Sequence, residues 1–118
     1  MIEMTNEMEQ RIYEALEYRY GASTQIVVAI EELAELQQAL CKWLRSIYCA
    51  DQGPRLELKE HIREEIADAS IMLNQMELMF GDTADIQEQK LLRNYERVKD
   101  LFDEDGFLKP VRWWEDEE

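Results

Sequence analysis

The chain has 118 residues, of which 46% are hydrophobic and 34% charged, and its formal net charge is −14. This is the composition of one globular domain, not of a disordered chain. The negative charge repels polyanions and therefore argues against nucleic-acid binding, while an anionic small molecule would need cations as intermediaries. The longest apolar stretch, residues 26–30, is far too short to cross a bilayer, and the acidic N-terminus does not resemble a signal peptide.

Helical periodicity predicts four helices, at about residues 4–20, 24–50, 56–80 and 84–102. The breaks between them fall at Gly21, at Gly53-Pro54 and at Gly81, and Gly106 and Pro110 mark an irregular end. No segment alternates apolar and polar residues over the length of a strand. We therefore expect an all-α fold, an antiparallel bundle of four to five helices in a single domain (residues 1–110), followed by an acidic tail (residues 111–118).

Two cysteines lie in the second predicted helix. Cys41 and Cys49 are eight positions apart, which separates them by about 12 Å along a helix axis, beyond the reach of a disulfide. Free thiols are typical of a reducing compartment, so we expect a cytoplasmic protein.

Apolar residues recur in steps of four and three on the second and third predicted helices, a pattern typical of helical bundles. The second helix carries Ile26, Ile30, Leu33, Leu40, Leu44 and Ile47, and the third carries Ile62, Ile66, Ala69, Leu73, Met76 and Phe80. The short break between these helices favours an antiparallel hairpin whose two stripes face each other. The outer helices or a second copy of the chain would complete the bundle.

A short acidic segment occurs twice, once on each of these helices. Glu31-Glu32-Leu33-Ala34-Glu35 recurs 33 positions later as Glu64-Glu65-Ile66-Ala67-Asp68. In each copy one carboxylate lies at the edge of the apolar stripe, and a second follows one turn later on the same side. In a hairpin, Glu32, Glu35, Glu65 and Asp68 would converge. The alternative is an ordinary solvated acidic face.

Four converging carboxylates would repel one another and raise one another's pKa values. A hard divalent cation removes that penalty, and a site made of oxygen ligands suits Mg²⁺ or Mn²⁺. The duplicated segment therefore predicts a metal site.

The paired motif, E-E-x-x-E and then E-E-x-x-D about thirty residues later, resembles the MazG-like, all-α nucleoside triphosphate pyrophosphohydrolases. The resemblance covers roughly residues 20–100. It includes Gln25 ahead of the first motif and a run of four residues in the last helix: Ile86, Lys90, Arg93 and Arg97.

The resemblance implies that Glu32, Glu35, Glu65 and Asp68 hold Mg²⁺. It also implies hydrolysis of a nucleoside triphosphate between the α- and β-phosphates to a nucleoside monophosphate and pyrophosphate, a reaction that cleans the nucleotide pool. A homodimer or homotetramer is expected as well. Within this expectation Glu31, or alternatively Glu64, activates water as general base. Lys90, Arg93 and Arg97 share a helix face and stabilise the departing pyrophosphate, or they form a solvated basic face.

Two residues are candidates for binding the base. Gln25 and Trp43 project from the same edge of the second helix as Glu32, and Trp43 lies about 16 Å from it along the axis. Its indole could stack on a base, or it could pack in the core or at an interface. Gln25 could read base edges or bridge helices, and His61 is expected to be an exposed helix residue. Trp113 and Trp114 could cap the bundle, meet a partner subunit or close over the nucleotide.

Other chemistries lack the residues that they need. One histidine, with Leu58 three positions before it, rules out the paired E-x-x-H steps of a di-iron bundle, and no P-loop sequence is present. Aligning Gly106 with the glycine of a calcium loop places Leu101 and Arg112 at ligand positions, which excludes that loop. Two alternatives stay open: a diphosphatase acting on dUTP or dUDP, and a non-catalytic acidic helical module that binds a protein partner.

Overall fold

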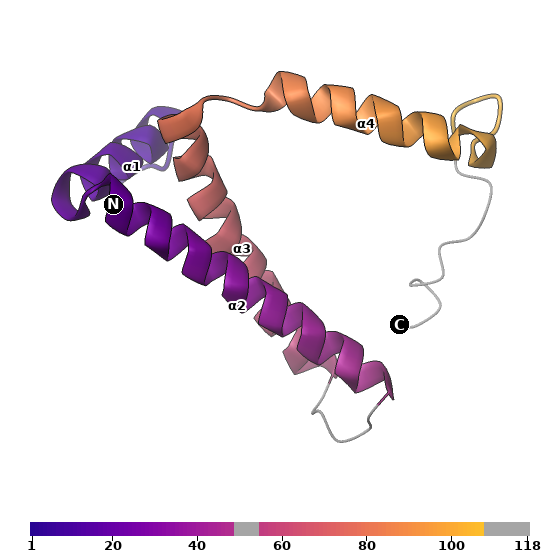
Figure 1. Ribbon diagram of the computed structural model, residues 1–118, viewed down its shortest axis with the longest axis horizontal. Helices are drawn as coiled ribbons and strands as arrows, with labels where there is room; N and C mark the ends of the chain where they lie inside the picture. Colours follow the sequence, from indigo (N-terminus) through magenta and orange to yellow (C-terminus); the bar gives the residue numbers. More distant parts are fainter. Residues whose placement is uncertain (49–54, 108–118) are drawn as a thin grey trace. The chain divides into compact units, whose positions relative to one another are not determined.

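The computed structural model describes residues 1–48 and 55–107. In these ranges the secondary structure is helical, with no strand (Figure 1): α1 (Asn6–Tyr20), α2 (Ala22–Tyr48), α3 (Arg55–Phe80), α4 (Ala84–Val98) and a 3₁₀ turn, η1 (Lys99–Leu101). The predicted all-α class is confirmed. The chain forms two compact units, Met1–Gly81 and Asp82–Glu118, and the expected domain of residues 1–110 spans parts of both. The acidic tail and Cys49 lie outside the described residues.

Local signals explain where α1 begins and ends. The hydroxyl of Thr5 accepts a hydrogen bond from the backbone N–H of Met8 at 3.1 Å, which caps the helix. Gly21 ends it with a φ of 91°, in the left-handed region that favours glycine. Because this single residue separates the two helices, α2 begins immediately at Ala22.

Helices α2 and α3 pack along each other as a hairpin, and α1 contacts both. The residues where α2 meets the rest of the unit recur in steps of four and three, and they are buried or half-buried: Gln25, Ala29, Glu32, Leu36, Ala39 and Trp43. The corresponding residues of α3 are Leu58, Ile62, Glu65, Ala69, Met72, Met76 and Met79. Alanine at several of these positions lets the two backbones approach closely. We call this contact the seam.

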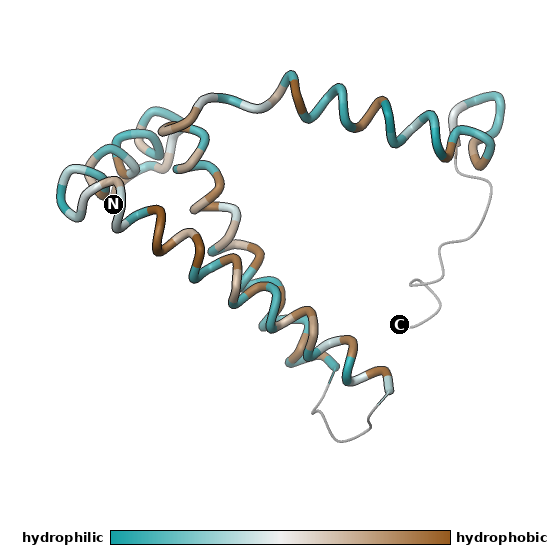
Figure 2. Tube along the Cα trace, viewed as in Figure 1, coloured by the Kyte–Doolittle hydropathy of each residue, from teal (hydrophilic) through white to brown (hydrophobic). Residues whose placement is uncertain are grey.

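The residues in the seam are not the ones that the sequence predicted, because the apolar stripes were expected to face each other there. On α2, Ile30 is 61% and Leu44 is 55% exposed, and on α3 Leu73 is 48% exposed. The stripe lies one position, or about 100°, around α2 from the seam, whereas Ile62, Ala69 and Met76 of the α3 stripe lie in the seam. The expectation that the two stripes face each other is therefore wrong. Hydrophobic side chains on α2 are therefore at the surface. Figure 2 marks in brown where hydrophobic residues recur along this helix.

The second unit contains α4 and η1. None of the described side chains of α4 is buried, and Leu91, Leu92 and Tyr95 are largely exposed. The ring of Tyr95 contacts that of Phe102 with centroids 5.7 Å apart, so the residue that follows η1 packs on the last turns of α4.

In the part of the chain that the structure describes, no helix combines the length and the apolar character needed to cross a membrane.

Candidate metal centre

Three of the four predicted ligands come together across the seam. Glu32 extends from α2, and Glu65 and Asp68 extend from α3. Each offers a carboxylate oxygen, and these three oxygens lie within 4.8 Å of one another. This separation is close to what donors bound to one divalent ion require, because ligands about 2.1 Å from an octahedral ion are about 3.0–4.2 Å apart. We call Glu32, Glu65 and Asp68 the carboxylate cluster.

Glu35, the fourth predicted ligand, borders this cluster. Its negative charge helps to raise the pKa values of both Glu32 and Glu65, so its carboxyl group lies close to theirs. The duplicated acidic segment thus brings two carboxylates from each helix into one neighbourhood.

The cluster contains buried oxygen atoms that lack a hydrogen-bond partner. Glu65 is 9% exposed, and its Oε2 atom and that of Glu32 are buried without a partner among the described residues. A buried acceptor without a partner destabilises a folded protein unless a ligand, ion or water satisfies it. These two oxygens therefore fit the donor set of a bound dication.

Burial and repulsion raise the pKa values of the two seam carboxyl groups. For Glu32 the largest cause is desolvation, followed by the negative charges of Glu35, Asp68 and Glu65. For Glu65 it is again desolvation, followed by the charge of Glu35, while His61 acts in the opposite direction and lowers the pKa. Both groups thus hold a proton more strongly than an exposed glutamate does.

The predicted general bases stand outside the cluster. Glu31 and Glu64 are exposed, and each lies one position, or about 100° of helix rotation, before a seam carboxylate. Leu33 and Glu35 are two positions apart and therefore point to opposite sides of α2, as Ile66 and Asp68 do on α3. The hairpin thus has a carboxylate face and, opposite to it, an apolar face.

Of the two candidates for base binding, Gln25 is buried in the seam at 5% exposure. Near this end of the hairpin, Gln75 is 1% exposed and donates a hydrogen bond of 3.5 Å to the backbone oxygen of Tyr13, whereas its own Oε1 is buried without a partner. The Tyr13 hydroxyl donates to Glu9 at 2.5 Å, and Asn74 donates to the same oxygen at 3.2 Å.

Trp43, the other candidate, is half-buried near the far end of the hairpin. The guanidinium of Arg55 lies 5.4 Å from the centre of its ring. A hollow of about 260 Å³ borders the indole, and it is lined by Leu40, Trp43, Lys59, Ile62 and Arg63. The lining of this hollow is partly apolar and partly basic, the basic side chains being those of Lys59 and Arg63.

The predicted phosphate-binding residues lie on α4 in the second unit, and all three are exposed. Arg97 donates a hydrogen bond of 3.5 Å to Asn94, one turn earlier. Lys90, Arg93 and Arg97 recur in steps of three and four and so share one side of α4. Trp113 and Trp114 lie outside the described residues.

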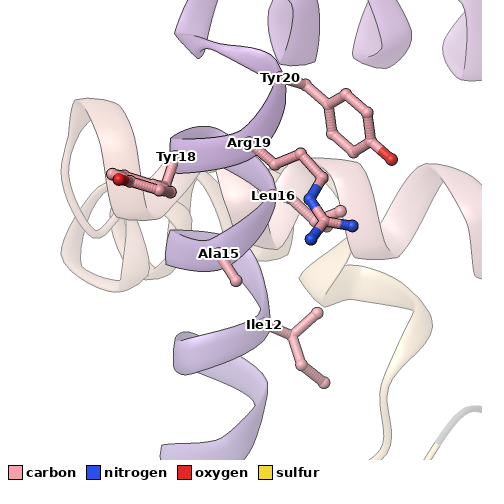
Figure 3. Close-up of a pocket in the computed structure, with 6 residues that line it drawn as sticks. All are labelled: Ile12, Ala15, Leu16, Tyr18, Arg19 and Tyr20. Carbon is pink, nitrogen blue, oxygen red and sulfur yellow. The ribbon is translucent and has the colours of Figure 1, made fainter.

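Sequence reasoning missed two features of the first unit, Met1–Gly81. A hollow of about 890 Å³ lies beside α1, where Ile12, Ala15, Leu16, Tyr18, Arg19 and Tyr20 line it (Figure 3). His61, expected to be a simple exposed residue, has its Nε2 atom 3.9 Å from Oε1 of Glu65, although half of its side chain is exposed. The spacing of four between these two residues could have indicated the second feature.

Comparison with known proteins adds no relative: no family model, no curated protein and no solved structure matches the chain.

Proposed function

We propose that the chain is a Mg²⁺-dependent nucleotide pyrophosphohydrolase that hydrolyses a nucleoside triphosphate between its α- and β-phosphates. The observation that carries the proposal is the carboxylate cluster, in which a buried carboxylate from each of two helices has an oxygen without a partner. The cluster explains how a chain of net charge −14 could bind a polyphosphate, since a dication would neutralise both. The motif resemblance adds the reaction type.

Glu32, Glu65 and Asp68 would hold the cation, and Glu35, whose charge already acts on both buried glutamates, would join them as the fourth ligand. Mg²⁺ supplies charge neutralisation for phosphate oxygens and acidifies a bound water, and Mn²⁺ can replace it. The helices hold all four side chains near the seam, so the ligands need little rearrangement.

Water activation falls to a carboxylate outside the cluster. Glu31 is our first candidate, because it is exposed and precedes Glu35 by one turn, and Glu64 is the second. A nucleophilic water needs a base that is free to accept a proton, and a ligand already bound to a cation is a poor base. Replacing each residue by glutamine separately distinguishes the two.

Lys90, Arg93 and Arg97 would stabilise the departing pyrophosphate, because they are exposed cations on one side of α4. Trp43 would stack on the base, and the hollow beside it offers a surface for a planar ring. Gln25 lies about 27 Å along α2 from Trp43, so its buried side chain would fix the hairpin and would not contact the same base.

The test is to incubate the chain with a panel of nucleoside triphosphates, dUTP and dUDP, with Mg²⁺ or with EDTA, and to identify the products. We expect pyrophosphate and a nucleoside monophosphate only when Mg²⁺ is present, and none from the Glu32→Gln variant. Exclusive use of deoxyuridine nucleotides would select the dUTP/dUDP diphosphatase alternative. Absence of any product with Mg²⁺ and with Mn²⁺ would contradict the proposal.

A homo-oligomer is part of the proposal, and the apolar face is where a second copy would pack. The apolar face is about 25 Å long, which is the length of residues 30–47 along α2. It is about 20 Å wide, because it spans two helices of about 10 Å each. A face of about 500 Å² lies in the upper part of the range of about 300–600 Å² for the largest apolar patch of a typical monomer, and two such faces reach about 1,000 Å², the lower bound for a specific interface. The stripe positions of α2 carry no charge, so two acidic copies can meet there without placing like charges in contact.

The same face favours the non-catalytic alternative, an acidic helical module that binds another protein. The two readings differ in what the carboxylate face does. A module needs no buried carboxylates, whereas the enzyme loses its activity without them. The nucleotide panel therefore decides between the two.

A further inference from the structure

The single histidine of the chain stands beside the carboxylate cluster. His61 precedes Glu65 by four positions on α3, which directs both side chains to one side of the helix. Its Nε2 atom lies 3.9 Å from Oε1 of Glu65, and half of the His61 side chain is exposed, against 12% of the Glu65 side chain. His61 is thus an accessible nitrogen donor next to a buried carboxylate, just outside the three oxygens that lie within 4.8 Å of one another.

The distance between these two atoms suits a shared ion. Donors about 2.1 Å from one octahedral cation lie about 3.0 Å apart when adjacent and about 4.2 Å apart when opposite. The observed 3.9 Å falls within this range, and it is longer than a hydrogen bond between the two groups. The other oxygen of Glu65, Oε2, is buried without a partner.

We propose that His61 is a nitrogen ligand at the rim of the carboxylate cluster, which gives this site a mixed oxygen and nitrogen donor set. The inference rests on the proposed metal site and deepens it by naming the class of cation. Mg²⁺ is satisfied by carboxylates and water, whereas imidazole strengthens the binding of later first-row transition-metal dications such as Co²⁺ and Ni²⁺. His61 therefore favours these ions while leaving Mg²⁺ binding to the carboxylates.

The test uses the metal ions alone, without nucleotide. Pulsed electron paramagnetic resonance on the Mn²⁺-loaded chain should show modulation from a directly bound ¹⁴N nucleus, and His61→Ala should abolish it. In titrations, His61→Ala should weaken Co²⁺ binding by about tenfold or more and change Mg²⁺ binding little. Ser70→Ala is the matched control, because Ser70 is exposed on α3 and points about 140° away from Glu65.

The outcomes separate this inference from the proposed function. Mn²⁺ that binds without nitrogen modulation, with equal Co²⁺ affinity in the wild type and the His61→Ala variant, would overturn the histidine ligand and leave an oxygen-only site standing. Failure of the wild type to bind Mn²⁺, Co²⁺ or Mg²⁺ would overturn the metal site itself. Because His61 is half-exposed, its replacement by alanine should not unfold the chain, and circular dichroism checks this.

Discussion

An oxygen of Glu32 on α2 lies within 4.8 Å of an oxygen of Glu65 on α3, although 33 positions separate the two residues in the sequence. Both carboxyl groups occupy the seam where hydrophobic residues would ordinarily pack. Burying two like charges so close together is costly unless they are protonated or bound to a cation. The two buried carboxylates therefore lower the free energy of unfolding of the metal-free hairpin, and this has measurable consequences.

The first prediction concerns the stability of the metal-free chain as a function of pH. The pKa values of Glu32 and Glu65 are raised above 4.5 in the folded chain, so the folded state binds more protons than the unfolded state above that pH. Their contribution to stability is fully present below about pH 4.5 and is lost as the pH rises through the raised pKa values. Urea unfolding in EDTA at several pH values measures this loss.

Glu65→Gln isolates the effect, because glutamine does not titrate. In EDTA the variant should gain stability relative to the wild type as the pH rises, and Glu64→Gln, its exposed neighbour, should not. Adding Mg²⁺ should stabilise the wild type and the control but not Glu65→Gln. A constant difference between Glu65→Gln and the wild type across this pH range would mean that the buried carboxyl group does not titrate as described.

The second prediction concerns Gln75, whose Oε1 is buried without a partner and whose Nε2 makes one long hydrogen bond. Gln75→Met keeps a similar shape and removes the buried acceptor, so we expect stability to be unchanged or to rise by about 1 kcal/mol. Urea unfolding measures the change. A loss of more than about 1 kcal/mol would show that the amide has a partner that outweighs the cost of burying it.

The third prediction concerns close packing at the seam. Ala69 is 2% exposed where α2 and α3 meet, so a larger side chain would force the helices apart. Ala69→Leu should destabilise the chain by about 1–3 kcal/mol and weaken Mg²⁺ binding, because the ligands sit on both helices. Ala67→Leu, on the exposed side of the same turn, is the control and should have little effect on either.

The fourth prediction concerns self-association. Leu44→Glu places a charge within the apolar face, and Gln38→Glu places the same charge on an exposed position of α2 outside it. Analytical ultracentrifugation should show an oligomer for the wild type and for Gln38→Glu, and a smaller species for Leu44→Glu. An oligomer of unchanged size in Leu44→Glu would exclude this face as the interface.

The fifth prediction concerns the basic side of α4. Lys90→Ala removes a cation that would interact with the leaving pyrophosphate, so we expect kcat to fall by about tenfold or more, with a smaller change in KM. Lys99→Ala is the control, because Lys99 is paired with Glu96 at 2.8 Å outside the basic side. Equal turnover by Lys90→Ala and the wild type would remove this residue from the mechanism.

The sequence indicated the helices well but not how they pack. Periodicity and the breaks at Gly21 and Gly81 place the ends of the helices within a few residues, because both signals are local. The seam could not be found this way, since Ala29, Ala39 and a buried Gln25 give a weaker hydropathy signal than the leucines and isoleucines of the stripe. At the seam, the close approach of the α2 and α3 backbones, which small side chains permit, determines the packing.

The candidate site was found for a different reason. The acidic segment repeats at one position on each of two adjacent helices, so an antiparallel hairpin brings its copies together even though the stripes do not face each other. The contact between His61 and Glu65 depends on side-chain conformation, which periodicity does not report. The roles of Lys90, Arg93 and Arg97 remain predictions, because α4 belongs to the second unit.

The most direct measurement is a calorimetric titration of Mg²⁺ into the metal-free chain at neutral pH, repeated with Glu32→Gln, Glu65→Gln and Glu64→Gln. The wild type and Glu64→Gln should bind the cation, and the two seam variants should lose most of their affinity. Wild-type protein that binds no Mg²⁺, or a Glu65→Gln variant that binds it as tightly as the wild type, would contradict a metal centre built on the seam carboxylates.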